Sequence, residues 1–258
     1  MDLRPSGPLQ IPAVVILLIL VGSAMHLQFN PISIFKDLGN SAVIIQELLS
    51  FDVTVADKVA FAIVETIEMA LIGTVIGFIL AVPASLIAAK NTSPIYLSIF
   101  VKGIINILWS IPALLSAIVL VVVVGLGPTA GILALALYTL GFSGKYLYEI
   151  YESQNPSAYD VVKVAGAGRL QVMRYVTLPE ASPYLVSQFL FMLSYNIKNS
   201  SILGLVGAGG IGFYVIHYLE SLQYGKASMF LLAVVLTIIA MDWLSTRLRR
   251  QLAKEHSP

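Results

Sequence analysis

The sequence contains no cysteine and few charged residues, and each absence excludes a class of protein. Without cysteine the chain has no disulfides, no thiolate metal ligands and no cysteine nucleophile. Charged residues make up 11% of the 258 residues and hydrophobic residues 58%. A soluble domain carries about 25% charged residues. The composition therefore indicates an integral membrane protein, with no room for a soluble catalytic domain between its apolar segments.

Side chains that could support chemistry are scarce and scattered. The histidines His26, His217 and His256 lack the spacing of metal ligands, so we expect no metal site. Hydroxyl and amine groups such as Ser143 and Lys145 have no general base at a useful spacing. We therefore expect a protein that is not an enzyme and that binds no cofactor of its own.

Six apolar segments predict an all-α protein with about six transmembrane helices, because a span needs about 20 apolar residues. The first, Ile11–Leu27, is expected to be an anchor helix rather than a removed signal peptide, since neither a basic region nor a cleavage site accompanies it. Gly73 and Gly77, which lie in the second apolar segment, allow a neighbouring helix to come close to it. Tyr96–Leu108 is expected to lie at the membrane interface. The other predicted spans are residues 58–89, 113–124, 129–148, 184–205 and 227–244.

These segments also divide the chain and orient it. Residues 1–56 are expected to form the anchor and an outer interfacial segment, residues 57–250 the membrane domain, and residues 251–258 a cytoplasmic tail. With the N-terminus inside, eleven of the 15 lysines and arginines lie on the inner side and three on the outer side, while Lys198 lies within a span. The positive-inside rule therefore predicts that both termini are cytoplasmic.

The longest polar stretch between two apolar segments is Asp160–Pro183, which carries several basic residues and is therefore expected to face the cytoplasm. Its pattern predicts two short helices, with Gly166 and Gly168 between them as a hinge. Leu178-Pro179 is expected to end the second helix before the next span. A short amphipathic helix in this position would lie on the membrane surface or dock into a groove of another protein.

The segment 207–212 matches the pattern GxGxxG, but its surroundings argue against a nucleotide site. Such a site needs a preceding strand and an acidic residue about 20 residues further on, whereas here an apolar span precedes and Glu220 lies too close. We expect a backbone that bends sharply and packs closely, which glycine permits. Irregular backbone near the membrane must be buried or line a cavity, so we assign the segment to the outer mouth of a pathway. The glycines of this outer gate loop are Gly204, Gly207, Gly209, Gly210 and Gly212.

Lys198 is the most informative charge, because a cation at the centre of a membrane helix costs at least about 2.5–3.5 kcal/mol. Glu65 and Glu68, in the outer part of the span 58–89, are the expected partners. Two interpretations remain open, a salt bridge that only supports packing and a role in attracting or passing an anion. The polar residues around Lys198 that would share a translocation pathway with it are Asn196, Asn199, Ser200 and Ser201.

The polar stretch resembles the cytoplasmic loop of importer-type ABC permeases. In that loop Glu-Ala-Ala is followed after three residues by Gly, and after nine more by Ile, any residue, and Leu-Pro. Here Asp160-Val161-Val162 stands at the Glu-Ala-Ala position, and Gly166, Val176, Leu178 and Pro179 follow at the matching positions. The resemblance implies a coupling helix that docks into an ATPase subunit. The ATPase-coupling residues it implies are Asp160, Val161, Val162, Ala165, Gly166 and Pro179.

Three further stretches, residues 124–137, 196–212 and 242–249, resemble the phosphonate/phosphite permease subunits of ABC importers, in which arginine usually stands where this chain has Lys198. The resemblance implies a type I ABC importer permease fold and a bacterial or archaeal inner membrane. It also implies a second copy of the chain, two cytoplasmic ABC ATPases that bind the ATP, and an extracytoplasmic binding protein, with no nucleic acid partner.

Several alternatives stay open. The cargo could be methionine or another small solute instead of a phosphorus oxyanion. The chain could pair with a second, different permease instead of its own copy. An ion-driven secondary carrier is the alternative from another class, and it would require titratable acids near the membrane midplane.

Overall fold

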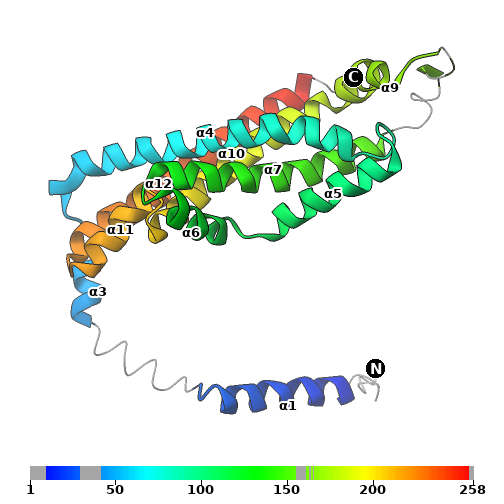
Figure 1. Ribbon diagram of the computed structural model, residues 1–258. Helices are drawn as coiled ribbons and strands as arrows, with labels where there is room; N and C mark the ends of the chain where they lie inside the picture. The colour runs from blue at the N-terminus through cyan, green and yellow to red at the C-terminus, as the bar shows by residue number, and fades with distance from the viewer. Residues whose placement is uncertain (1–9, 30–41, 155–160, 163, 165, 256–258) are drawn as a thin grey trace. The chain divides into compact units, whose positions relative to one another are not determined.

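The computed structural model describes residues 10–29, 42–154, 161–162, 164 and 166–255. Within these residues the regular elements are all helical (Figure 1). The chain divides into two compact units, residues 1–49 and residues 50–258.

The first unit contains α1 (Gln10–His26) and α3 (Ala42–Leu48). α1 coincides with the predicted anchor helix to within one residue at each end. Its 17 residues extend over about 26 Å at 1.5 Å per residue, slightly less than the roughly 30 Å of a bilayer's hydrocarbon core. α1 is therefore at the lower limit for a span.

The second unit is a helical bundle in which four helices are long and apolar enough to cross a membrane. Figure 1 shows them running alongside one another. One of them matches its predicted span to within two residues at each end, two extend five or six residues beyond the prediction at one end, and the fourth extends well beyond its prediction at the C-terminal side. They are α4 (Ala56–Ala88), α7 (Pro128–Ser153), α10 (Leu178–Leu203) and α12 (Tyr224–Glu255).

Between α4 and α7 the chain forms α5 (Ile95–Ser110) and α6 (Ala113–Val124), which are bent by 89° relative to each other. The predicted third span was Ala113–Val124 alone, and this is wrong because 12 residues are too few to cross a bilayer. Only the bent pair together is apolar and long enough. The bend lies at Pro112, whose ring restricts Ile111 to an extended conformation with φ −89° and ψ 117°.

The described residues thus contain four long spans, or five if the bent pair counts as one. The predicted total of six would require the shorter α1 to cross as well. The prediction of an all-α membrane protein is confirmed, and the connection through α5 and α6 is its main correction.

The helix before α10 also differs from the prediction. Leu178-Pro179 does not end it, because α9 (Arg169–Val172) and the π-helical turn η2 (Met173–Thr177) continue directly into α10. Pro179 has no N–H, and in a regular α-helix its ring would meet the carbonyl of Tyr175. The wider turn, in which the Leu178 N–H donates to the Met173 carbonyl oxygen, accommodates the proline without a break.

Small residues bring α4 and α7 into close contact, as the glycine pair predicts. A Cβ atom on Gly73 would lie 2.7 Å from Leu135 Cβ, and one on Gly77 would lie 2.4 Å from the Ala136 carbonyl oxygen. The helix backbones therefore touch where both glycines lie.

The two ends of this bundle carry different residues. The glycine end carries residues 204–212, together with the first turns of α7, and η3 (Gly204–Val206) and α11 (Ile211–Glu220) lie there. The basic end carries Lys90, the end of α7 and the residues that lead into α10.

Candidate functional site

At the glycine end, the glycines of the predicted outer gate loop bend the chain and let it pack against α4 and α7. Gly207, Gly209 and Gly210 have positive φ angles of 83°, 82° and 73°. The other two allow close backbone contact, since a Cβ atom on Gly212 would overlap the Ser201 carbonyl oxygen and one on Gly204 would lie 2.5 Å from the Phe213 nitrogen. Side chains at these positions would displace the loop.

Two hydrogen bonds hold this loop in place. The Ile211 N–H donates to Thr66 Oγ1 at 2.8 Å, which connects the start of α11 to α4. The Gly127 N–H donates to the Gly207 carbonyl oxygen at 2.9 Å, which connects the turn before α7 to the loop. These two bonds join the loop to both α4 and α7.

Lys198 lies on a different side of α10 from the one that was expected. Among the residues that the structure describes, no ion pair joins it to Glu65 or Glu68, so the predicted pair is wrong for a single copy of the chain. The register of α10 explains this. Asn196 and Ser200 face α4, where they contact Thr74 and Met69. Lys198 is two residues from each of them, which on an α-helix is almost the opposite side.

Asn196 forms the centre of a buried polar contact among three helices. Its side-chain amide donates to Thr74 Oγ1 of α4 at 2.8 Å and to Thr139 Oγ1 of α7 at 2.7 Å. All three side chains are fully buried. Hydrogen bonds of this kind hold membrane helices in register, so Asn196 links α4, α7 and α10 within one chain.

The remaining polar residues predicted for the pathway are divided between these two sides of α10. Ser200 and Ser201 are buried, whereas Lys198 and Asn199 are half-buried. Glu68 is exposed and Glu65 half-buried. The structure therefore brings Asn196, Ser200 and Ser201 into the bundle and leaves Lys198 on a partly open side.

That partly open side carries a ladder of aromatic rings, contributed by α7 and α10. Tyr138 stacks on Tyr195 with ring centroids 5.7 Å apart, and Phe142 stacks on Phe191 at 5.9 Å and on Tyr195 at 6.2 Å. All four rings are half-buried. Lys198 lies one turn beyond Tyr195 on the same side of α10.

At the basic end the structure describes part of the predicted coupling region. Val161, Val162 and Val164 are helical, and Gly166 follows them with a φ of +86° and no atom within 4 Å of where a Cβ would lie. Asp160 and Ala165 lie outside the described residues. The hinge position at Gly166 is therefore exposed and left-handed, a conformation that favours glycine.

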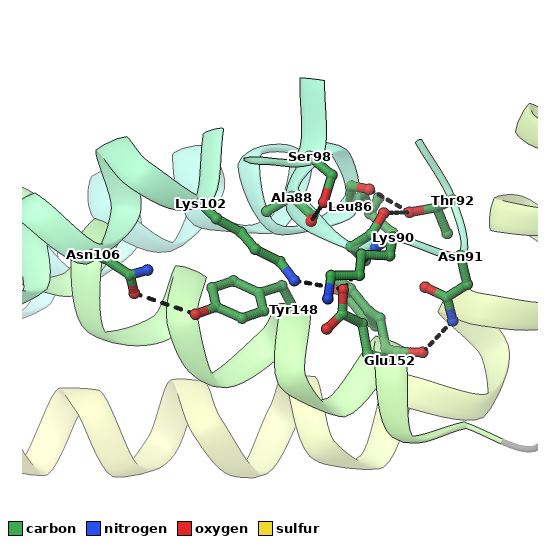
Figure 2. Close-up of polar contacts among 12 residues, drawn as sticks. Leu86, Ala88, Lys90, Asn91, Thr92, Ser98, Lys102, Asn106, Tyr148 and Glu152 are labelled. Carbon is green, nitrogen blue, oxygen red and sulfur yellow. Dashed lines mark hydrogen bonds and ion pairs between the residues drawn. The ribbon is translucent and has the colours of Figure 1, made fainter. Parts of the chain in front are cut away.

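A second group of polar contacts lies close to this region, where the ends of α4 and α7 meet α5 (Figure 2). Lys102 Nζ lies 2.7 Å from Glu152 Oε1, and the Lys90 N–H donates to the same oxygen at 2.7 Å. Asn91 donates to the Tyr151 carbonyl oxygen at 2.6 Å. Lys102 also lies 4.8 Å from the centre of the Tyr148 ring, on the side of α7 that faces α5.

These contacts make Glu152 a junction between the end of α7 and the connection from α4 to α5. Ser98, in the first turn of α5, donates to the Ala88 carbonyl oxygen and Thr92 donates to that of Leu86, so the connection is itself tied back to α4 (Figure 2). Side-chain contacts thus hold α4, α5 and α7 together at the basic end. They are made by Asn91, Thr92, Ser98, Lys102 and Glu152.

Most of these contact residues were not among those predicted from the sequence. Thr74 and Thr139 are polar residues within apolar spans, which is a usable signal for helix contact. The ladder shows as pairs of aromatic residues four positions apart, at 138 and 142 and at 191 and 195. Nothing in the sequence pairs Glu152 with Lys102.

Comparison with known proteins identifies similar chains. Residues 81–254 match the model of a family described as binding-protein-dependent transport system inner membrane component. The phosphite transport system permease protein PtxC of Stutzerimonas stutzeri is 32% identical over 189 residues, which are 73% of this chain and 69% of PtxC. The phosphate-import permease protein PhnE of Mycolicibacterium smegmatis is 30% identical over 242 residues, which are 91% of this chain and 45% of PhnE. Measured against its relatives, this chain thus spans from about half to two thirds of their length.

A solved structure shows the same arrangement of helices. The inward-facing MetNI methionine ABC transporter contains a chain that is 25% identical, with a TM-score of 0.65 over 75% of this chain and 95% of that one. A chain of an amino acid ABC transporter, with 16% identity and a TM-score of 0.62 over 79% of this chain and 100% of its own, shares the fold.

Proposed function

Because the chain belongs to the family of binding-protein-dependent transport system inner membrane components, we propose that it is the membrane-embedded permease subunit of an ATP-driven importer. The observation that carries this proposal is the family match over residues 81–254, which includes α7, α10 and most of α12. The likeness to a chain of the MetNI transporter supports the same assignment.

The proposed subunit works in an assembly. Its basic end faces the cytoplasm, in keeping with the distribution of lysine and arginine. Two ATPase subunits bind there, one on each copy of a homodimer, and each receives the helix that contains Val161 and Val162. An extracytoplasmic binding protein delivers the cargo at the glycine end. The membrane is the inner membrane of a bacterium or archaeon, and both termini of the chain are cytoplasmic.

The proposed cargo is a small phosphorus oxyanion of the phosphonate or phosphite class. Two relatives are named for phosphite and phosphate transport, which supports this class. Lys198 supports it independently, since it places a positive charge on a partly open side of the bundle near the glycine end. Lysine attracts an anion as a point charge and lacks the bidentate geometry of arginine.

Uptake by the reconstituted assembly tests the function. The chain would be placed in proteoliposomes with its ATPase inside and its binding protein outside, and accumulation of phosphite, methylphosphonate, phosphate and methionine would be compared. We expect ATP-dependent uptake of at least one phosphorus oxyanion and none of methionine. Uptake of methionine alone would overturn the cargo, and uptake driven by an ion gradient without ATP would overturn the transporter class.

A further inference from the structure

We propose that a hollow near the basic end binds a phosphorus oxyanion on its way to the cytoplasm, and that Arg249 is its cationic ligand. The proposal rests on the cargo class proposed above. The hollow has a volume of about 270 Å³ and lies between α7, α10 and α12. Its lining residues are Phe142, Tyr146, Ser187, Gln188, Phe191 and Arg249.

Arg249 is directed toward this hollow by the packing of α12 on α10. Ser245 is buried, and its hydroxyl donates to the Leu190 carbonyl oxygen at 3.0 Å. Arg249 comes four residues later and therefore lies on the same side of α12, one turn closer to the basic end. It is half-buried. The Arg249 side chain lines the hollow beside α10, and its guanidinium Nη2 also donates to Thr246 Oγ1 of its own helix at 3.4 Å.

The two neighbouring arginines face elsewhere and serve as internal comparisons. Arg247 lies 5.2 Å from the centre of the Trp243 ring. Together with Arg250 it lines a separate hollow on another side of α12. Both arginines are exposed. Of the three arginines in this turn, Arg249 is the one that lines the space between α12 and the aromatic ladder.

The polar groups around Arg249 suit an oxyanion. Tyr146 and Ser187 supply hydroxyl donors, and the Gln188 amide is oriented by its contact with Ser143 Oγ at 3.3 Å. No carboxylate is among the residues that line the hollow. Charge-assisted hydrogen bonds from a guanidinium are the strong contacts that anions make in proteins.

The size of the hollow also fits a small solute. A volume of about 270 Å³ is enough for several water molecules. Pockets for drug-sized ligands begin at about 300 Å³. A tetrahedral anion with part of its hydration shell fits this space.

The hollow lies on the side of α10 that also carries Lys198. Ser187, Phe191 and Tyr195 follow one another at four-residue spacing, and Lys198 comes three residues later, so all four share one side of the helix. The distance along the axis from Ser187 to Lys198 is about 16 Å. The aromatic ladder lies between them. An anion released near Lys198 would thus pass along uncharged rings to a second cation at the basic end.

The test compares Arg249→Gln with Arg250→Gln, which removes the same charge from the same helix but from another side. ATP-driven phosphite uptake would be measured as a function of phosphite-loaded binding protein in phosphatidylcholine vesicles, with and without phosphatidylglycerol. We expect Arg249→Gln to lower uptake about tenfold, as the loss of a charged hydrogen bond predicts. Arg250→Gln should change it less than about twofold, because its side chain is exposed.

The outcomes separate the possible occupants. A loss in both vesicle types that is specific to Arg249→Gln supports binding of the free anion. A loss confined to vesicles with phosphatidylglycerol would assign the arginine to a lipid headgroup and overturn the proposal, as would equal behaviour of the two variants. If Arg249→Gln does not assemble, Ser187→Ala provides the same test within the hollow. Wild-type uptake of phosphite with no contrast between variants would refute only this inference, whereas failure of the wild type would refute the proposed function.

Discussion

The side-chain amide of Gln154 donates a hydrogen bond of 3.0 Å to the backbone carbonyl oxygen of Thr177. Gln154 directly follows α7, and Thr177 directly precedes α10. Both side chains are buried. The contact therefore closes the base of the segment between these helices, the segment proposed to meet the ATPase. A force applied to that segment would act on α7 and α10 together.

Gln154→Ala should weaken this transmission without preventing insertion of the chain. A single neutral hydrogen bond contributes about 0.5–1.5 kcal/mol, so the bundle should remain folded. We expect ATP hydrolysis by the assembled complex to continue while the amount of cargo imported per ATP falls. Ser153→Ala is the matched control, since Ser153 is exposed and its hydroxyl donates to the Ile150 carbonyl oxygen of its own helix. An unchanged ratio of uptake to hydrolysis in Gln154→Ala would show that the contact is not used in coupling.

Gly166→Val tests the hinge. The φ of +86° at Gly166 lies in the left-handed region, which costs a residue with a Cβ roughly 1–2 kcal/mol. Space is not the obstacle, because nothing lies within 4 Å of a Cβ there. The preceding helix should therefore be reoriented, and ATP hydrolysis should become uncoupled from uptake while the amount of protein in the membrane stays the same.

Gly168→Val is the control for this variant, because Gly168 is only two residues away and has a φ of −72° that any residue adopts. A Cβ atom added to Gly168 would lie 3.8 Å from Gln171 Oε1, which is an ordinary contact distance. If both variants uncouple equally, the backbone conformation at Gly166 is not the reason.

Glu152→Gln tests the junction at the basic end. The substitution removes the charge that holds Lys102 but keeps an oxygen that can accept from the Lys90 N–H. The side chains of Glu152 and Lys102 are 26% and 16% exposed. Because both are partly reached by water, loss of the ion pair should lower the stability by about 1 kcal/mol or less. We expect a small decrease in the unfolding temperature of the purified chain that disappears at high salt. Glu149→Gln, three residues earlier and exposed, should leave that temperature unchanged, and an equal decrease in both variants would argue against a specific ion pair.

The features that sequence analysis predicted well are those with a local cause. α4 and α7 were predicted because each contains an apolar stretch close to the roughly 20 residues that a membrane span needs. The contact at Gly73 and Gly77 was predicted because small residues allow the backbone of a neighbouring helix to come close. The bend between α5 and α6 was missed although Pro112 marks it, because a proline shows where a helix stops but not the direction of the next one.

The side of α10 on which Lys198 lies could not be predicted from the sequence either. α10 carries polar and aromatic residues around much of its circumference, so its hydrophobic pattern leaves its rotation undefined. Its contacts define that rotation, with Asn196 between Thr74 and Thr139 on one side and the aromatic ladder on another. Contacts between residues this far apart in the chain depend on packing and are not visible in any local pattern.

Lys198 itself provides the most direct test of how the chain treats its cargo. Since no ion pair with Glu65 or Glu68 holds it among the described residues, its charge is available to an anion that passes along the partly open side of α10. Lys198→Glu would repel such an anion, and like charges in close contact cost several kcal/mol. We therefore expect phosphite uptake to fall about tenfold or more, whereas Lys198→Arg, which keeps the charge, should retain most of it.

The control for Lys198→Glu is Lys58→Glu, which makes the same change of charge at an exposed position in the first turn of α4. A general effect of negative charge on insertion or on docking of the binding protein would lower uptake in both variants. A fall confined to Lys198→Glu would assign the effect to the side of α10 that carries the aromatic ladder. If Lys198→Glu and Lys198→Arg both transport phosphite like the wild type, Lys198 only supports packing, and the anion must follow another side of the bundle.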